Sequence, residues 1–210
     1  MLKLGILSST KGTDMQAIID AINAKKLNAE ISIVISNKGA AFALERARKH
    51  GIKVLFIDPL NYDVSDDKEK SRENYDRKIA EVLEKNNVGL ILLIGYMKYM
   101  SKWFVRKFEN KIMNIHPSLL PKYAGGMNRK VHEDVLRNKE KVTGATLFFV
   151  DEGPDTGPII LQKEVRVDDG ENVESLKDKV QKAEQEIIIS AIDLFEKNRI
   201  KVEGKKVVIK

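Results

Sequence analysis

The stretch Asn114-Ile115-His116-Pro117-Ser118-Leu119-Leu120-Pro121 places an amide and an imidazole at the predicted end of a strand. Asn114 and His116 are two residues apart, so on an extended backbone both side chains leave the same face. Pro117 lacks the N–H that a strand ladder needs, and it therefore predicts where the strand ends. Open α/β sheets bind ligands at the carboxyl ends of their strands, which makes this strand end a candidate functional site.

The residue types at this strand end suit acyl transfer. An amide can stabilise an oxyanion, and a neighbouring imidazole can exchange a proton near neutral pH. Downstream, the turn-rich segment Asp155-Thr156-Gly157-Pro158 supplies a carboxylate, which would orient the imidazole of His116 and stabilise its protonated form. Each residue also has a structural interpretation: a satisfied structural histidine, an asparagine that caps a loop, and an aspartate in an ordinary turn.

Hydrophobic runs on both sides of this stretch predict alternating strands and helices. Strands are expected at 4–7, 31–35, 54–57, 88–94, 111–115, 142–150 and 158–167, and helices at 15–22, 40–50 and 73–84. Residues 58–70 are polar and are expected to form a loop. The most apolar run, 88–94, is typical of a central parallel strand buried on both faces. The pattern predicts an α/β fold with a doubly wound, mainly parallel sheet, followed by a long helix at 173–195 and a hairpin at 200–209.

The composition indicates a soluble globular protein with one domain over residues 1–210. Of the 210 residues, 42% are hydrophobic and 32% charged, and none is cysteine, which excludes disulfides and thiolate chemistry. The apolar part of the N-terminus is too short for a signal peptide, and no run approaches the roughly 20 apolar residues of a membrane span. Lys and Arg number 37 against 31 Asp and Glu, a net charge of +6, and they are spread along the chain. Nucleic acid and membranes are therefore not expected partners, and a cytoplasmic location is expected.

A candidate anion site precedes the first predicted helix. The segment Ser8-Ser9-Thr10-Lys11-Gly12-Thr13-Asp14 joins that helix to the first predicted strand. Backbone N–H groups at a helix N-terminus attract phosphate, and a glycine lets the backbone approach closely. Gly12, Thr13 and Asp14 are the candidate phosphate-binding residues. The carboxylate of Asp14 would repel a phosphate unless it turns away to cap the helix, which is the arrangement we expect.

The motif Asn-x-His-Pro-Ser-Leu-Leu-Pro, followed by Asp-x-Gly-Pro-Ile, resembles the signature of the folate-dependent formyltransferases. The likeness extends from Leu4 to about Phe195, with supporting matches at 12–18, 36–38, 44–47 and 95–98. The resemblance implies a Rossmann-like formyltransferase fold and transfer of a formyl group from 10-formyltetrahydrofolate to the amine of glycinamide ribonucleotide, a step of purine biosynthesis. It implies that Asn114, His116 and Asp155 are catalytic, and that neither a metal nor a covalent enzyme intermediate is needed.

The resemblance also implies binding residues. Gly12 and Thr13 would hold the phosphate of the ribonucleotide, and Glu184 matches a residue that bonds the ribose hydroxyls. The implied folate-binding residues are Met97, Lys98, Tyr99, Met100, Asp151, Glu152, Gly153 and Pro154. Residues 1–100 would form the nucleotide- and phosphate-binding half, and 101–210 the catalytic and folate-binding half. Without the resemblance, Glu184 would be taken as a solvated helix carboxylate, and the Met and Tyr residues as core.

The chain departs from the family's pattern at several positions. Ser9, Thr10 and Asp14 stand where the family usually has two glycines and an asparagine. Lys98 replaces an arginine, so a bidentate grip on a carboxylate becomes a point charge. Phe148 stands where many members have a histidine, whereas His132 matches a family histidine.

Several alternatives stay open on the sequence. Formyltetrahydrofolate hydrolase and methionyl-tRNA formyltransferase share the chemistry, but the first has an added N-terminal domain and the second an added C-terminal domain. A non-catalytic phosphosugar-binding module is the alternative of another class, and loss of the Asn, His and Asp set would favour it. The expected partners are the small-molecule substrates glycinamide ribonucleotide and a reduced folate, with the chain a monomer or a homodimer.

Overall fold

The computed structural model describes residues 1–63 and 66–210. Within these residues the strands form a seven-stranded sheet in the order β3-β2-β1-β4-β5-β6-β7, and a separate two-stranded sheet, β8-β9. Strand β1 pairs in parallel with β2 and β4, β2 pairs in parallel with β3, and β6 pairs with β7 in the antiparallel sense. The predicted α/β class with a mainly parallel sheet is therefore confirmed. The chain divides into two compact units, Met1–Met113 and Asn114–Lys210.

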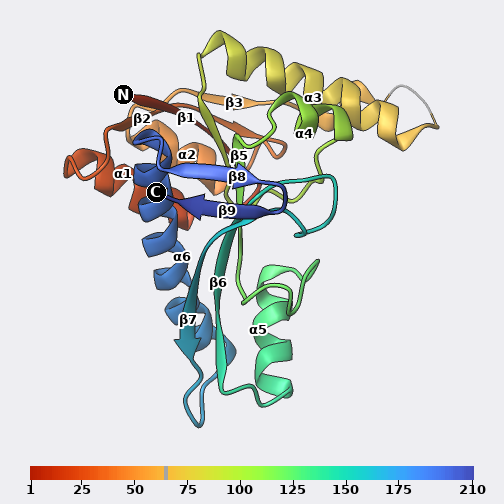
Figure 1. The fold of residues 1–210 in the computed structure, drawn as a ribbon. Helices are drawn as coiled ribbons and strands as arrows, with labels where there is room; N and C mark the ends of the chain where they lie inside the picture. Colours follow the sequence, from red (N-terminus) through yellow and green to blue (C-terminus); the bar gives the residue numbers. More distant parts are fainter. Residues whose placement is uncertain (64–65) are drawn as a thin grey trace. The chain divides into compact units, whose positions relative to one another are not determined.

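The first unit carries most of the parallel strands. Its elements are β1 (Leu2–Leu7), α1 (Thr13–Asn23), β2 (Ala29–Ser36), α2 (Phe42–Lys49), β3 (Val54–Phe56), the 3-10 turn η1 (Pro59–Tyr62), α3 (Lys68–Lys85), β4 (Leu90–Leu93), α4 (Lys102–Lys107) and the start of β5 (Ile112–His116). All four residues of β4 are buried, as expected for a central parallel strand. Helices α1 and α2 pack against β2, and α3 lies beside α4 (Figure 1).

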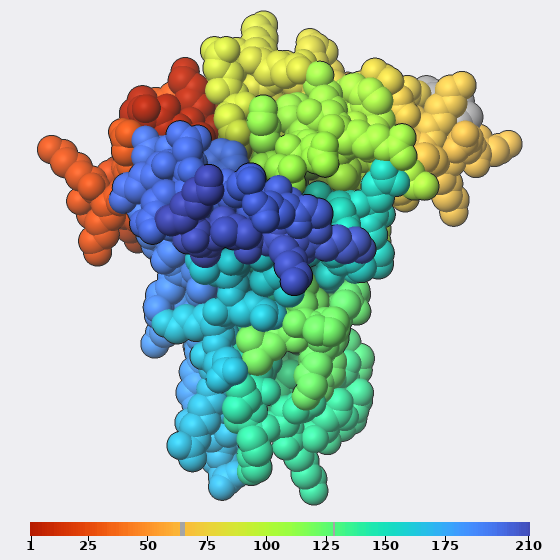
Figure 2. Space-filling view, in the orientation of Figure 1, coloured from red at the N-terminus to blue at the C-terminus, as the bar shows by residue number. Residues whose placement is uncertain are grey.

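The second unit is built on the antiparallel pair β6 and β7. Its elements are the end of β5, α5 (Asn128–Arg137), β6 (Val142–Phe149), β7 (Ile159–Arg166), α6 (Val173–Glu196), β8 (Ile200–Glu203) and β9 (Lys206–Ile209). Helix α6 starts at a capping box between Asn172 and Ser175, and it packs along β6 and β7 (Figure 1). The hairpin β8–β9, dark blue in Figure 2, lies on the surface, and Gly204 at its turn has φ +62°.

Several local predictions are confirmed. Strand β5 ends at His116, directly before Pro117. The helix predicted at 40–50 is present as α2, and Gly51 just after it has φ +69°, the left-handed conformation typical of a glycine that stops a helix. The long C-terminal helix and the closing hairpin are both present.

The predicted loop at 58–70 is partly wrong. It contains η1 and the first turn of α3, which begins at Lys68 because Asp67 accepts hydrogen bonds from the N–H groups of Glu69 and Lys70. Val64 and Ser65, within the same prediction, lie outside the described residues. Helices α4 and α5 were not predicted, since α4 has only six residues and presents too little hydrophobic periodicity. Among the described residues, no helix combines the length and the apolar character needed to cross a membrane.

Candidate active site

His116, which is buried, pairs with the partly exposed Asp155 in the second unit. His116 is 3% exposed, and its Nδ1 lies 3.2 Å from Oδ2 of Asp155. The same Oδ2 accepts the backbone N–H of Gly125 at 2.8 Å. On the other side of the ring, Nε2 lies 3.0 Å from the backbone carbonyl oxygen of Tyr123. The imidazole is therefore held from both sides, by a carboxylate and by a carbonyl.

This geometry constrains where the protons lie. A carbonyl oxygen only accepts, so Nε2 must carry a proton to bond with Tyr123. In a neutral ring Nδ1 would then present a lone pair to the carboxylate of Asp155. When the ring is an imidazolium, both nitrogens carry a proton. Nδ1 then donates to the carboxylate of Asp155 and Nε2 to the carbonyl of Tyr123, so both contacts are attractive. Burial lowers the pKa of His116 from its usual value, while Asp155 and the carbonyl of Tyr123 oppose that effect, so the imidazolium is a ready proton donor.

The loop that follows His116 is pinned to the neighbouring strands. The hydroxyl of Thr146, on β6, donates to the carbonyl of Ser118 at 2.7 Å and accepts the N–H of Leu120 at 3.0 Å. Nε2 of Gln162, on β7, donates to the carbonyl of Leu120 at 3.1 Å. Two strands thus fix the backbone next to the imidazole.

The turn that carries Asp155 is shaped by its own sequence. Oδ1 of Asp151 accepts the N–H of Gly153 at 3.0 Å and the hydroxyl of Thr156 at 2.7 Å, which closes a side-chain turn. A Cβ at Gly157 would lie 1.7 Å from the carbonyl oxygen of Phe149, so only glycine fits there. Asp155 itself has φ +54°, a left-handed conformation that aspartate tolerates better than most residues.

The predicted phosphate loop lies in the first unit. Gly12 is the N-cap of α1 and has φ +63°, and a Cβ there would lie 2.9 Å from Cβ of Ala43. No side chain caps this helix, which begins at Thr13. The prediction that Asp14 is the cap is therefore wrong: Asp14 is the second helical residue and is 7% exposed. Its charge still lies in the first turn, where it complements the positive end of the helix.

The predicted folate segment after β4 is exposed at its centre. Met97 is 38% exposed and Tyr99 65%, so the alternative in which they belong to the core is wrong. Nζ of Lys98 lies over the ring of Tyr75, 5.5 Å from its centroid.

Ser9 makes contacts between loops that the sequence interpretation missed. Its hydroxyl accepts the N–H of Met97 at 2.9 Å and donates to Oδ1 of Asn37 at 2.5 Å, and its own N–H donates to the carbonyl of Gly95 at 3.1 Å. The loops after β1, β2 and β4 are thereby joined within the first unit. A serine next to a glycine-containing loop gives no signal in the sequence for such a role.

The remaining predicted residues are placed as follows. Asn114 lies on β5, two positions before His116, and is partly exposed; Glu184 is half-buried in the middle of α6. His132, on α5, is buried, and its Nδ1 has no hydrogen-bond partner within the described residues. Burial, with help from Lys177, lowers the pKa of His132 to about 4, so it is neutral at pH 7.

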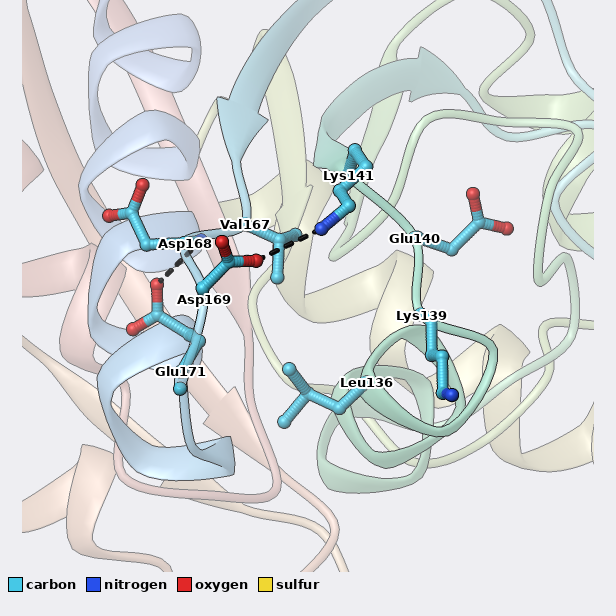
Figure 3. A pocket seen from close by; sticks show the side chains of 9 residues that line it. Leu136, Lys139, Glu140, Lys141, Val167, Asp168, Asp169 and Glu171 are labelled. Carbon is cyan, nitrogen blue, oxygen red and sulfur yellow. Dashed lines mark hydrogen bonds and ion pairs between the residues drawn. The ribbon is translucent and has the colours of Figure 1, made fainter.

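A cleft of about 260 Å³ in the second unit lies apart from these residues (Figure 3). Its lining residues are Leu136, Lys139, Glu140, Lys141, Val167, Asp168, Asp169, Gly170 and Glu171. Figure 3 shows Lys141 reaching across it to Asp169, with Nζ 2.9 Å from Oδ1. None of the predicted site residues lines this cleft. Apart from the pair of Lys141 and Asp169, its carboxylates pair with lysines outside the cleft: Glu140 with Lys122, and Asp168 and Glu171 with Lys179.

His116, at the end of β5, is thus paired with a carboxylate from the turn between β6 and β7, which places a titratable imidazole at a strand end of an α/β sheet. The chain belongs to the formyl transferase family, whose sequence profile matches residues 2–192.

Two curated proteins are similar to this chain over most of its length. The chain is 40% identical over 200 residues to the trifunctional purine biosynthetic protein adenosine-3 of Bos taurus; the match covers 95% of this chain but only 19% of that protein. It is 35% identical to phosphoribosylglycinamide formyltransferase of Escherichia coli (strain K12), with 96% of this chain and 90% of that protein covered.

Solved structures of formyltransferases resemble this chain as well. Glycinamide ribonucleotide transformylase 1 from Symbiobacterium toebii has a TM-score of 0.91 at 38% identity, with 100% of this chain and 94% of that chain covered. A formyltetrahydrofolate deformylase from Pseudomonas syringae has a TM-score of 0.85 at 22% identity, with 99% of this chain and 65% of that chain covered. At that identity the second likeness speaks for the fold alone.

Proposed function

We propose that this chain acts as a single formyltransferase domain that transfers the formyl group of 10-formyltetrahydrofolate to the amine of glycinamide ribonucleotide, a step of purine biosynthesis. The observation that carries the proposal is the contact between His116 and Asp155, whose geometry fits an imidazolium. The Escherichia coli relative supports it, since that match covers nearly the whole of both chains.

The proposed mechanism needs only groups of this chain and the two substrates. The neutral amine attacks the formyl carbon, and the carbonyl oxygen becomes an oxyanion that Asn114 and the protonated His116 stabilise by hydrogen bonds. For His116, the oxyanion would take the place at Nε2 that the carbonyl oxygen of Tyr123 has in this structure. Asp155 keeps the imidazolium in place through its carboxylate. The bond from the formyl carbon to the folate nitrogen then breaks, the amine nitrogen loses a proton, and the folate nitrogen gains one, relayed through His116 or water.

The proposed binding residues come from both units of the chain. We propose that the backbone of Gly12 and Thr13, at the N-terminus of α1, holds the nucleotide's phosphate, because the glycine brings that backbone within reach of an anion. Glu184 would bond the ribose hydroxyls. The folate would contact Met97, Lys98, Tyr99 and Met100 and the turn at 151–154, where Asp151 also holds the turn together. The substrates are small molecules. We expect a monomer or homodimer in the cytoplasm, which gel filtration and cell fractionation would test.

Turnover should depend on both substrates. With a formyl-folate analogue whose loss of formyl changes its absorbance, we expect steady turnover when glycinamide ribonucleotide is present and none when it is absent. Formylated nucleotide, identified by mass spectrometry, should appear in equal amount to the deformylated folate. Turnover without the nucleotide, yielding formate, would identify a hydrolase instead. Binding of the nucleotide without any turnover would favour a phosphosugar-binding module.

Asp14→Asn should lower the KM for glycinamide ribonucleotide. Since Asp14 is not the helix cap, its carboxylate lies in the helical turn proposed to bind the phosphate, and like charges repel. Removing the charge should lower KM by roughly threefold to tenfold with little change in kcat, the mark of altered uniform binding. Steady-state kinetics at varied nucleotide will measure this. Asp20→Asn, an exposed position later in α1, is the matched control. An unchanged KM would show that the Asp14 carboxylate does not act on the phosphate.

A further inference from the structure

Asp76, in the middle of α3, is an almost fully buried carboxyl group that the proposed mechanism does not use. It is 1% exposed, and its Oδ2 accepts the backbone N–H of Ser101 at 2.5 Å. Ser101 is itself fully buried and caps α4, its hydroxyl accepting the N–H of Phe104 at 3.3 Å. Burying an ionised carboxylate is unfavourable unless it is paired and hydrogen-bonded. Burial raises the pKa of Asp76 to about 6, so the group is charged at neutral pH at the expense of stability.

Two cationic side chains near Asp76 favour its charged form. Arg72, on the same helix, and Lys98, on the segment after β4, both lower the pKa of Asp76 against the effect of burial. Tyr75 and Tyr96 also face it, and the hydroxyl of Tyr96 donates to that of Tyr75 at 3.2 Å. Burial raises the pKa of Tyr75 to about 12 and raises that of Tyr96 as well, so both stay neutral. Asp76 is the group of this cluster that changes charge near neutral pH.

The segment Gly95–Ser101 is held by buried polar groups at both ends. Ser9 holds its first part through the N–H of Met97 and the carbonyl of Gly95. Asp76 holds its last residue through the N–H of Ser101. In the sequence, Lys98 lies between the two held ends of the segment, and its charge interacts favourably with that of Asp76.

We propose that Asp76 is a positioning residue for the formyl donor: its charge fixes the segment Gly95–Ser101 and the place of Lys98, and so sets the affinity for the reduced folate. The inference rests on the proposed function, because that function assigns the segment to the donor. A buried charge that opposes stability while it holds an exposed binding segment is typical of a functional site. A purely structural acceptor for Ser101 would not need the charge.

Asp76→Asn tests the proposal, because asparagine keeps the shape and an acceptor oxygen for Ser101 but removes the charge. The KM for the formyl donor should rise on the order of tenfold, while kcat and the KM for the nucleotide change little. Binding of tetrahydrofolate, measured by calorimetry, should weaken by the same factor. At pH 8 the variant should melt higher than the native protein, by about 2–4 °C or more. Glu73→Gln removes a charge one turn earlier on α3, where Glu73 pairs with Arg77, and is the matched control.

The pH dependence gives a second measurement. As pH falls through about 6, Asp76 becomes protonated, so the donor KM of the native protein should rise while that of Asp76→Asn stays flat. Because the pKa is raised on folding, the native protein gains stability as pH falls through that value, and the difference in Tm between the two proteins should close.

Two outcomes would overturn the inference. One is an unchanged donor KM and tetrahydrofolate affinity in Asp76→Asn. The other is a lower Tm at every pH with equal losses for both substrates, which a structural role alone would produce. If the native protein did not formylate the nucleotide but tetrahydrofolate binding still weakened in the variant, the proposed function would fail and this inference would stand.

Discussion

His116→Ala should reduce kcat by about 10²–10⁴-fold while the fold is kept, because a positioned acid–base group contributes on that order. The imidazole is proposed to donate a hydrogen bond to the oxyanion and to relay the proton, and alanine can do neither. Of the three proposed catalytic residues, Asn114 and Asp155 would then remain. Single-turnover kinetics with saturating substrates would measure the chemical step directly, free of product release.

The histidine content of the chain offers a matched control. His50, just after α2, has an exposed side chain, and His50→Ala should keep native kcat. Circular dichroism and thermal melting of both variants would show whether the fold survives. Retention of more than about a tenth of native kcat by folded His116→Ala would show that the imidazole is not the catalytic acid–base group.

The sequence predicted those parts of the fold where one strong physical preference dominates. Pro117 has no N–H to donate to a neighbouring strand, so its position predicted that β5 ends at the residue before it. The run through β4 is apolar at every position, which only a strand buried on both faces explains well. The helix predicted at 40–50 is followed by Gly51, and the hairpin predicted at 200–209 turns at Gly204; both glycines have the positive φ that glycine adopts at least cost.

The sequence failed where tertiary contacts decide. The first two turns of α3 are polar, and the hydrophobic pattern that reveals the helix begins only near Tyr75, so its N-terminus was predicted too late. Helix α5 has a narrow buried stripe, carried by Val131 and Val135, in a segment that reads as a polar continuation of the loop. Asp14 was expected to cap α1 because aspartate favours that position, but Gly12 already occupies it in a left-handed conformation.

The candidate site shows the same division. The motif residues His116 and Asp155, far apart in the sequence, were predicted to pair, and the structure places them 3.2 Å apart. The carbonyl of Tyr123, which contacts His116, and the N–H of Gly125, which donates to Asp155, are backbone groups. Nearly every residue has such groups, so no side-chain pattern reveals these partners. Buried Asp76 was read only as part of a helix, since burial of a charged residue depends on its neighbours in space.

Asp155→Asn should slow turnover by roughly 10²-fold or more, on the order seen when the carboxylate behind a catalytic imidazole is neutralised. One oxygen of Asp155, Oδ2, receives both Nδ1 of His116 and the N–H of Gly125. An asparagine whose amide oxygen takes that place keeps both contacts, so the substitution removes the charge and leaves the geometry. The effect on kcat then reports on the stabilisation of the imidazolium alone.

The pH profile gives the sign of the effect. Asp155 raises the pKa of His116 against the effect of burial, so removing its charge should lower that pKa further. The protonated ring, which the mechanism needs, would then be lost at lower pH, and the alkaline limb of kcat against pH should move toward acid. Asp151→Asn, in the same turn, keeps an oxygen that accepts the N–H of Gly153 and the hydroxyl of Thr156, and it should leave that limb where it is, whatever it does to the donor KM. Full activity of Asp155→Asn with an unmoved alkaline limb would show that the pair seen in the structure does not control the proton.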